Sequence, residues 1–181
     1  MRVAINGFGR IGRMVFRAYL QKLSRNENLP FEIVAINDLG NPEQTAHLLK
    51  YDTNYGTWPD KITGEEGRLT VGDRSFTLVK NRNPEELPWK ELQIDLVIEC
   101  TGVFRNREGA SRHLTGGAKR VMISAPGKGD IDATFVMGVN HESYDPENHF
   151  IISNASCTTN CLAPITKVLN DAFGIKRGMI T

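Results

Sequence analysis

Alternation between short apolar runs and amphipathic stretches constrains the fold of this chain more than any other feature. The apolar runs have the length of strands, and helical patterns follow most of them. Continuous runs such as Val121-Met122-Ile123 are typical of parallel strands that helices cover on both faces. The sequence therefore predicts an α/β fold with a doubly wound parallel sheet. The expected strands are Arg2–Asn6, Glu32–Asn37, Leu96–Glu99, Arg120–Ser124 and Phe150–Asn154, and the expected helices are Ile11–Leu23, Pro42–Tyr51, Asn106–Leu114 and Ser156–Phe173.

Two segments depart from this rhythm. Apolar residues on either side of Gly72-Asp73, a turn dipeptide, predict an antiparallel hairpin inserted into the parallel fold. After a good helix-ending residue at Gly174, another apolar run begins at Gly178 and reaches Thr181. We expect this last run to be the start of a further strand.

Three glycines follow the first expected strand and open the first expected helix. Gly7, Gly9 and Gly12 have the spacing that allows a tight turn and lets a pyrophosphate approach the N–H groups of a helix N-terminus. Arg10 and Ile11 would supply those N–H groups. Glycines of an ordinary strand-to-helix turn are the alternative, since the bare pattern is weak. Its context favours a Rossmann-type dinucleotide site.

An acidic residue stands where such a site needs one. Asp38 follows the second expected strand, where a carboxylate can accept hydrogen bonds from a ribose diol and repel a 2′-phosphate. NAD is therefore favoured over NADP, although residual use of NADP stays open, and so does a role of Asp38 as a loop cap. Arg82 is either a solvated charge or a contact to the cofactor.

Cys157 is the candidate nucleophile. It lies at the start of an expected helix, where free N–H groups and the helix dipole stabilise a thiolate. A small buried apolar residue is the alternative, and we expect that role for Cys100 and Cys161. Three cysteines without zinc-site spacing predict neither a disulfide framework nor a bound metal.

A thiolate beside a nicotinamide suggests the oxidation of an aldehyde through a thioester that water or phosphate opens. This chemistry needs a general base. His141 and His149 are weak candidates, whereas His47 and His113 lie in helical patterns and are expected to be solvated or capping residues. The sequence alone does not say which histidine approaches Cys157.

Composition excludes several classes of partner. The 181 residues carry 22 Lys and Arg against 21 Asp and Glu, so the net charge of +1 gives no footprint for nucleic acid or for an anionic membrane surface. No apolar stretch approaches the roughly 18 residues of a membrane span, and no signal segment follows Met1. We therefore expect a cytoplasmic protein.

Four segments together resemble glyceraldehyde-3-phosphate dehydrogenase, and the resemblance covers nearly the whole chain. The run Ser-Asn-Ala-Ser-Cys-Thr-Thr-Asn-Cys is the most specific, although it is shared with erythrose-4-phosphate dehydrogenase. The stretch from Ser124 to Gly127 is more similar to the glyceraldehyde enzyme, and the erythrose enzyme is kept as the alternative. The four segments are Val3–Arg13, His47–Thr53, Glu99–Phe104 and Ser153–Cys161.

The resemblance implies a phosphorylating, NAD-dependent enzyme of glycolysis. Cys157 would form a thioester from glyceraldehyde 3-phosphate, inorganic phosphate would release 1,3-bisphosphoglycerate, and Ser156 and Thr158 would contact substrate or phosphate. Together with the glycines, it gives this set of expected cofactor contacts: Gly7, Gly9, Arg10, Ile11, Gly12, Asn37, Asp38, Arg82, Thr101, Gly102, Phe104 and Ser124.

The resemblance also implies a division of the chain. Residues 1–155 would form the NAD-binding Rossmann domain, and residues 156–181 the nucleophile helix and the start of a catalytic domain. In this family the catalytic histidine and the sites for substrate phosphates come later, so we expect the chain to need a C-terminal half for activity. The alternative is an autonomous NAD-binding module without turnover. A homotetramer is expected for the full-length parent.

Overall fold

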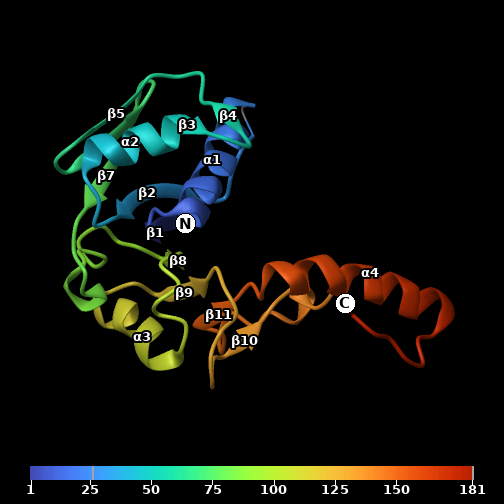
Figure 1. Cartoon of the computed structure of the whole chain (residues 1–181). Helices are drawn as coiled ribbons and strands as arrows, with labels where there is room; N and C mark the ends of the chain where they lie inside the picture. The colour runs from blue at the N-terminus through green and yellow to red at the C-terminus, as the bar shows by residue number, and fades with distance from the viewer. Residues whose placement is uncertain (26, 181) are drawn as a thin grey trace.

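A computed structural model describes residues 1–25 and 27–180 (Figure 1). Four α-helices and two short 3-10 helices lie in this described part: α1 (Arg10–Ser24), α2 (Pro42–Lys50), η1 (Pro84–Glu86), α3 (Arg107–Thr115), η2 (His141–Ser143) and α4 (Cys157–Phe173). Its strands are β1 (Arg2–Asn6), β2 (Glu32–Asn37), β3 (Tyr51–Asp52), β4 (Gly56–Thr57), β5 (Ile62–Glu65), β6 (Arg68–Val71), β7 (Arg74–Val79), β8 (Leu96–Glu99), β9 (Arg120–Ile123), β10 (Ala133–Thr134) and β11 (Ile151–Ser153).

The strands form one large mixed sheet and a small hairpin. Within the described residues, the large sheet has nine strands in the order β10-β11-β9-β8-β1-β2-β7-β6-β5, and β3 pairs with β4. All pairs from β10 to β7 are parallel, whereas β7-β6 and β6-β5 are antiparallel. The chain runs from β1 to β2 on one side and later to β8 on the other. The strand order therefore reverses between β1 and β8, where an α/β sheet has its ligand crevice.

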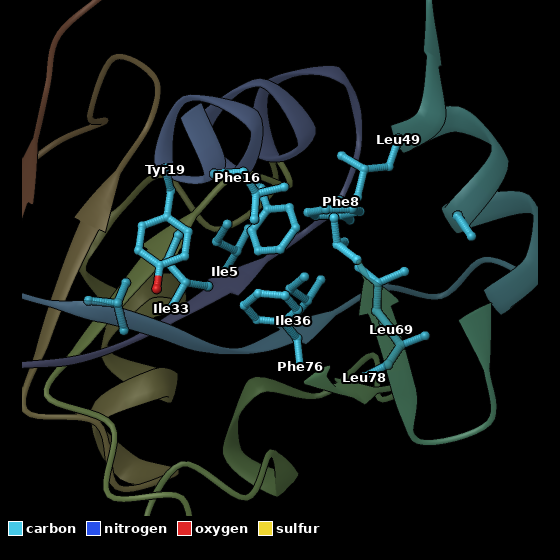
Figure 2. Close-up of a cluster of buried hydrophobic side chains, with 14 of the residues drawn as sticks. Ile5, Phe8, Phe16, Tyr19, Ile33, Ile36, Leu49, Leu69, Phe76 and Leu78 are labelled. Atoms are coloured by element: carbon cyan, nitrogen blue, oxygen red, sulfur yellow. The ribbon is translucent and has the colours of Figure 1, made fainter. Parts of the chain in front are cut away.

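One face of the sheet is covered by α1 and α2. Phe16 of α1 packs edge-on against Phe8 and Phe76, with ring centroids 5.5 and 4.8 Å apart, above the apolar side chains of β1 and β2 (Figure 2). Leu49 of α2 joins the same cluster. Burial of this apolar face is what holds the helices on the sheet.

The opposite face is covered by α3 and by the loop that precedes β8. Ala110 of α3 packs on Val121 and Ile123, and Trp89 of the loop packs with Ala4 and Val97. Both faces of β1 and β8 are therefore covered, whereas one face of β9 is only half-buried. This arrangement confirms the doubly wound architecture predicted from the sequence.

The predicted hairpin insertion is also confirmed. β6 and β7 pair antiparallel around Gly72-Asp73, and β5 extends them to three strands. β7 in turn pairs in parallel with β2, so the insertion continues the main sheet. The loop after β7 is thereby brought beside the carboxyl end of β2.

The end of the chain differs from the prediction. Residues 178–180 form no strand, and Thr181, the last residue of that expected strand, lies outside the described residues. α4 ends before Gly174, which has a φ of +70°, as expected for a helix-ending glycine. In Figure 1, α4 extends away from the sheet, and none of its residues is buried. None of the described helices is both long and apolar enough for a membrane crossing.

Candidate functional site

Five of the candidate site residues that the sequence singled out follow the carboxyl ends of parallel strands. Gly7 follows β1, Asp38 follows β2, Thr101 follows β8, Ser124 follows β9, and Cys157 lies four residues after the end of β11. Because these five strands are parallel, their carboxyl ends share one edge of the sheet. The topology therefore gathers the expected contacts from five separate parts of the chain.

A cavity of about 810 Å³ lies at the strand switch point between β1 and β8. This volume is in the size range of small-molecule and cofactor pockets. Seven of the expected cofactor contacts line the cavity. Those seven are Gly7, Gly9, Asn37, Asp38, Arg82, Thr101 and Phe104, and the other lining residues are Asn6, Leu39, Asn81, Asn83, Cys100, Val103 and Arg112.

The N-terminus of α1 opens at this cavity. In the described part of the chain, α1 is the one α-helix that no side chain caps at its N-terminus, because its N-cap residue is Gly9. The first turn of α1 also holds no acidic residue. A Cβ added to Gly9 would meet no atom within 4 Å, so open space remains beside the free N–H groups. An anionic group such as a pyrophosphate fits there.

Gly7 and Gly12 are instead required by the backbone. Gly7 has a φ of +90°, and a Cβ there would lie 2.8 Å from the backbone nitrogen of Thr101. A Cβ on Gly12 would lie 2.2 Å from the carbonyl oxygen of Gly7. These two glycines let β1, α1 and the loop after β8 approach one another.

The carboxylate of Asp38 is held at the cavity from two sides. Oδ1 accepts a bond from the backbone N–H of Phe8 at 3.3 Å, and Oδ2 accepts one from the hydroxyl of Thr45 at 3.2 Å. A Cβ on Gly40 would lie 2.9 Å from Oδ2, so a side chain there would press on this carboxylate. Each carboxylate oxygen keeps a lone pair for a ribose hydroxyl.

Residues that sequence reasoning missed form one wall of the cavity. The guanidinium of Arg112 on α3 lies 5.6 Å above the ring of Phe104 and donates to Asn83 at 2.5 Å. Arg82 is exposed on the loop that also carries Asn81 and Asn83. No local signal marks Arg112, whose spacing is that of an ordinary exposed helix residue.

Five expected cofactor contacts do not line the cavity. The prediction for Arg10 concerns its backbone N–H, and the side chain of Arg10 forms an ion pair with Asp52 at 2.7 Å. Ile11 is exposed, and the backbone N–H of Ser124 donates to the carbonyl of Glu99 at 3.0 Å. The five are Arg10, Ile11, Gly12, Gly102 and Ser124.

Cys157 is the first residue of α4 and is exposed. The hydroxyl of Ser156 caps the helix by accepting the N–H of Thr159 at 2.9 Å, and Asn160 donates to the carbonyls of Asn154 and Ser156 at 2.7 and 2.9 Å. Thr158 and Cys161 both line a second cavity, which runs along α4. Because Cys157 is exposed, it is not the small buried apolar residue that the alternative described.

The turn before Cys157 is unusual. Ala155 has a φ of +65° although it is not a glycine, and its side chain is buried. Buried Ser153 supports this conformation, because its hydroxyl accepts the N–H of Ala155 at 3.0 Å and donates to the carbonyl of Ala125 at 2.7 Å. Strained backbone of this kind is found at functional sites.

The other thiols and histidines give mixed outcomes. Cys100 packs against the main core, as expected, and burial raises the pKa of its thiol to about 11. The prediction that Cys161 is a packing residue is wrong, because Cys161 is exposed. The prediction that His113 is solvated or capping is also wrong, because its side chain is fully buried among polar partners.

The two candidate bases are engaged elsewhere. Nδ1 of His141 accepts the N–H of Gly138 at 3.0 Å, and Nδ1 of His149 accepts the N–H of Asp145 at 2.9 Å. In the part of the chain that the structure describes, neither histidine forms a hydrogen bond with Cys157. The structure therefore supports neither of them as its base.

Comparison with known protein families shows to which family this chain belongs. The family model described as glyceraldehyde 3-phosphate dehydrogenase, NAD binding domain, matches residues 1–107. The chain belongs to the glyceraldehyde 3-phosphate dehydrogenase family. The model of the C-terminal domain of this family matches residues 156–181, where α4 begins. The family is one of NAD-dependent oxidoreductases, so the expected cofactor and the resemblance are both confirmed.

Named relatives agree with this assignment. Proteins called glyceraldehyde-3-phosphate dehydrogenase from a Nostoc species, Chlamydia pneumoniae and Streptomyces coelicolor are 57%, 55% and 52% identical to the chain. Each match covers 100% of this chain and 52% of the relative. The chain thus spans about half the length of these curated relatives of the dehydrogenase family.

Proposed function

We propose that this chain forms the NAD-binding and nucleophile-bearing part of a phosphorylating glyceraldehyde-3-phosphate dehydrogenase. The observation that carries the proposal is a shared edge: the cavity at β1 and β8 and the exposed Cys157 both follow carboxyl ends of one parallel sheet. Residues 1–155 would be the cofactor domain and residues 156–181 the start of the catalytic domain.

The cavity would hold NAD with its pyrophosphate at the N-terminus of α1. Gly9 leaves room there, Asp38 would accept the hydroxyls of a ribose, and the stacked pair of Phe104 and Arg112 would provide a flat surface for the adenine. Thr101 would contribute to the wall beside β8. When bound, NAD supplies a hydride acceptor.

Cys157 would carry the substrate through the reaction. Its thiolate adds to the carbonyl carbon of glyceraldehyde 3-phosphate, so that a C–S bond forms and the carbonyl electron pair becomes an alkoxide. Loss of hydride from that carbon restores the carbonyl and leaves a thioester on Sγ. Inorganic phosphate then attacks the thioester, the C–S bond breaks, and the thiolate leaves as 1,3-bisphosphoglycerate forms.

The start of α4 would serve the oxygens of substrate and phosphate. The hydroxyls of Ser156 and Thr158 lie 2.9 Å apart beside Cys157 and can donate to an anion. The helix N-terminus also favours negative charge at this place. For the whole protein we propose a cytoplasmic homotetramer, on the strength of the family alone.

Calorimetric titration with NAD, and with NADP in parallel, tests the cofactor site. We expect saturable binding of NAD, weaker binding of NADP, and a smaller difference between the two in Asp38→Ala because repulsion of the 2′-phosphate is lost. Equal binding of both nucleotides by the unaltered chain would contradict the role of Asp38. No binding to the folded chain would contradict the cofactor site itself.

Formation of NADH from glyceraldehyde 3-phosphate and phosphate tests the chemistry, once the folded chain is combined with the C-terminal half that it is expected to need. Turnover that disappears in Cys157→Ser and persists in Cys161→Ser would support the proposed nucleophile. Binding of NAD without turnover would favour the alternative of an NAD-binding module. Turnover that survives in Cys157→Ser would overturn the assignment of Cys157.

A further inference from the structure

A chain of buried polar side chains lies beneath the candidate NAD cavity. The indole Nε1–H of Trp89 donates to Nδ1 of His113 at 3.0 Å, and Nε2 of His113 lies 3.0 Å from Oε2 of Glu99. His113 and Glu99 are 0% and 1% exposed. Trp89 and His113 do not line the cavity, whereas Glu99 bonds to residues that do.

The bond from Trp89 fixes the state of His113. An indole can only donate, so Nδ1 of His113 must present a lone pair. The ring is then neutral and carries its proton on Nε2, from which it donates to Glu99. Trp89 thus sets the direction of the bond that reaches the carboxylate.

Glu99 accepts hydrogen bonds at both oxygens. Oε1 accepts the backbone N–H of Thr101 at 2.7 Å and the hydroxyl of the same residue, and Oε2 accepts Nδ2 of Asn6 at 2.6 Å in addition to His113. All four groups donate, so a carboxylate that accepts at both oxygens fits this place. Within the described residues no lysine or arginine pairs with this buried charge. Burial of an unpaired charge lowers stability, which points to a role other than stability.

The carboxylate also sets the orientation of two amides in the cavity. Because Nδ2 of Asn6 donates to Glu99, Oδ1 of Asn6 faces Nδ2 of Asn37, which donates to it at 2.7 Å. Oδ1 of Asn37 in turn accepts the N–H of Asn81 at 2.9 Å. A reversal of the Asn6 amide would place its Nδ2 against Nδ2 of Asn37 and its Oδ1 against the carboxylate of Glu99.

We propose that Glu99 is a positioning residue for the cofactor cavity. Its ionised carboxylate holds the loop at Thr101 and orients Asn6 and Asn37, while His113 and Trp89 hold the carboxylate from behind. The wall and floor of the cavity are thereby formed before a nucleotide arrives, which reduces the cost of binding. The inference rests on the proposed NAD site.

Glu99→Gln tests this role with almost no change of shape. The new NH₂ group must face either the donors of Thr101 or those of Asn6 and His113, so one side of the arrangement is lost. We expect NAD to bind roughly tenfold more weakly, as follows from one unsatisfied buried donor. Asp95→Asn is the matched control. Asp95 directly precedes the first residue of β8, and its carboxylate bonds to Arg2 and Lys119 and lies at the opposite end of the strand from the cavity.

The outcomes separate this inference from the proposed function. Weaker binding in Glu99→Gln but not in Asp95→Asn supports the positioning role. Equal binding by Glu99→Gln and the unaltered chain overturns it and leaves the NAD site intact. Failure of the unaltered chain to bind NAD overturns both.

The two tryptophans provide a second test on the unaltered chain, which is needed if Glu99→Gln does not fold. The indole N–H of Trp89 belongs to the polar chain, whereas that of Trp58 donates to Asp60 at 3.0 Å. Hydrogen bonds in a chain polarise one another. We expect the NMR signal of the Trp89 indole to shift as NAD saturates the protein, and that of Trp58 to stay in place. An unmoved Trp89 signal at saturation would overturn the inference.

Discussion

Gly7 and Gly9 lie two residues apart but have different tasks, and alanine at each position separates folding from cofactor binding. At Gly7 the φ of +90° and the contact with Thr101 oppose any side chain, so Gly7→Ala should lower the free energy of unfolding by more than about 1 kcal/mol. At Gly9 a methyl group enters open space in the cavity. Gly9→Ala should therefore keep its stability and bind NAD more weakly, as measured by urea unfolding and calorimetry.

Each of these two glycine variants has an outcome that would contradict the expectation. Gly9→Ala with undiminished NAD affinity would mean that the nucleotide does not occupy the space at the N-terminus of α1. Gly7→Ala with undiminished stability would mean that the turn after β1 can rearrange.

The three thiols should differ in their reaction with iodoacetamide near pH 8. Cys157 and Cys161 are exposed, whereas Cys100 is largely buried and burial raises its thiol pKa to about 11. Mass spectrometry of peptides should find the native protein modified at the first two positions and at Cys100 only in denaturant. Rapid labelling of native Cys100 would show that the loop after β8 opens.

At the scale of single residues, the sequence predicts where a candidate residue lies in the fold when that position depends on the neighbouring strand. Gly9, Asp38 and Cys157 each follow a strand, and the strands are visible as apolar runs. His113 was misassigned because its partners, Trp89 and Glu99, lie 24 and 14 positions away and no helical spacing shows them.

At the scale of elements, α1 is joined to the β3–β4 hairpin by Asp52, and this junction should depend on pH. The backbone N–H of Tyr55 and the guanidinium of Arg10 both donate to the Asp52 carboxylate and lower its pKa from 3.8 to about 2. A lowered pKa means that the folded state binds this proton more weakly than the unfolded state does. The stabilisation is thus complete above about pH 4 and is lost as the pH falls toward 2.

Asp52→Asn tests the junction. The variant should be less stable than the unaltered chain at pH 7, and the difference should shrink between pH 4 and pH 2, because protonation removes the same charge from the unaltered chain. Urea unfolding at several pH values measures this. A difference that stays constant over that range would assign the effect to hydrogen-bond geometry instead of charge.

Elements were predictable where burial gives them a pattern. The four helices and five of the seven strands that pair in parallel are predicted within a residue or two, because apolar faces mark them. The short strands β3, β4, β5 and β10 were missed because two to four half-exposed residues carry no such pattern. The wall made by Asn83 and Arg112 was missed for a related reason, since it exists only once β7 pairs with β2.

At the scale of the whole molecule, stability should be distributed unevenly between the sheet and α4. β1 and β8 lie in the middle of the sheet with both faces covered, whereas α4 buries none of its residues and exposes Val168 and Phe173. Backbone amides exchange with solvent most rapidly where few contacts must open. Hydrogen exchange followed by mass spectrometry should therefore show rapid exchange in α4 and slow exchange in β1 and β8.

α1 is the internal control for this measurement, because it has 15 residues against 17 in α4 and buries Phe16 and Leu20. NAD should slow exchange further where α1 begins and in the loop after β8, since both border the cavity. Protection of α4 equal to that of α1 would contradict the expectation. If that protection fell on dilution, the apolar side chains of α4 would be covered by another copy of the chain, because only association depends on concentration.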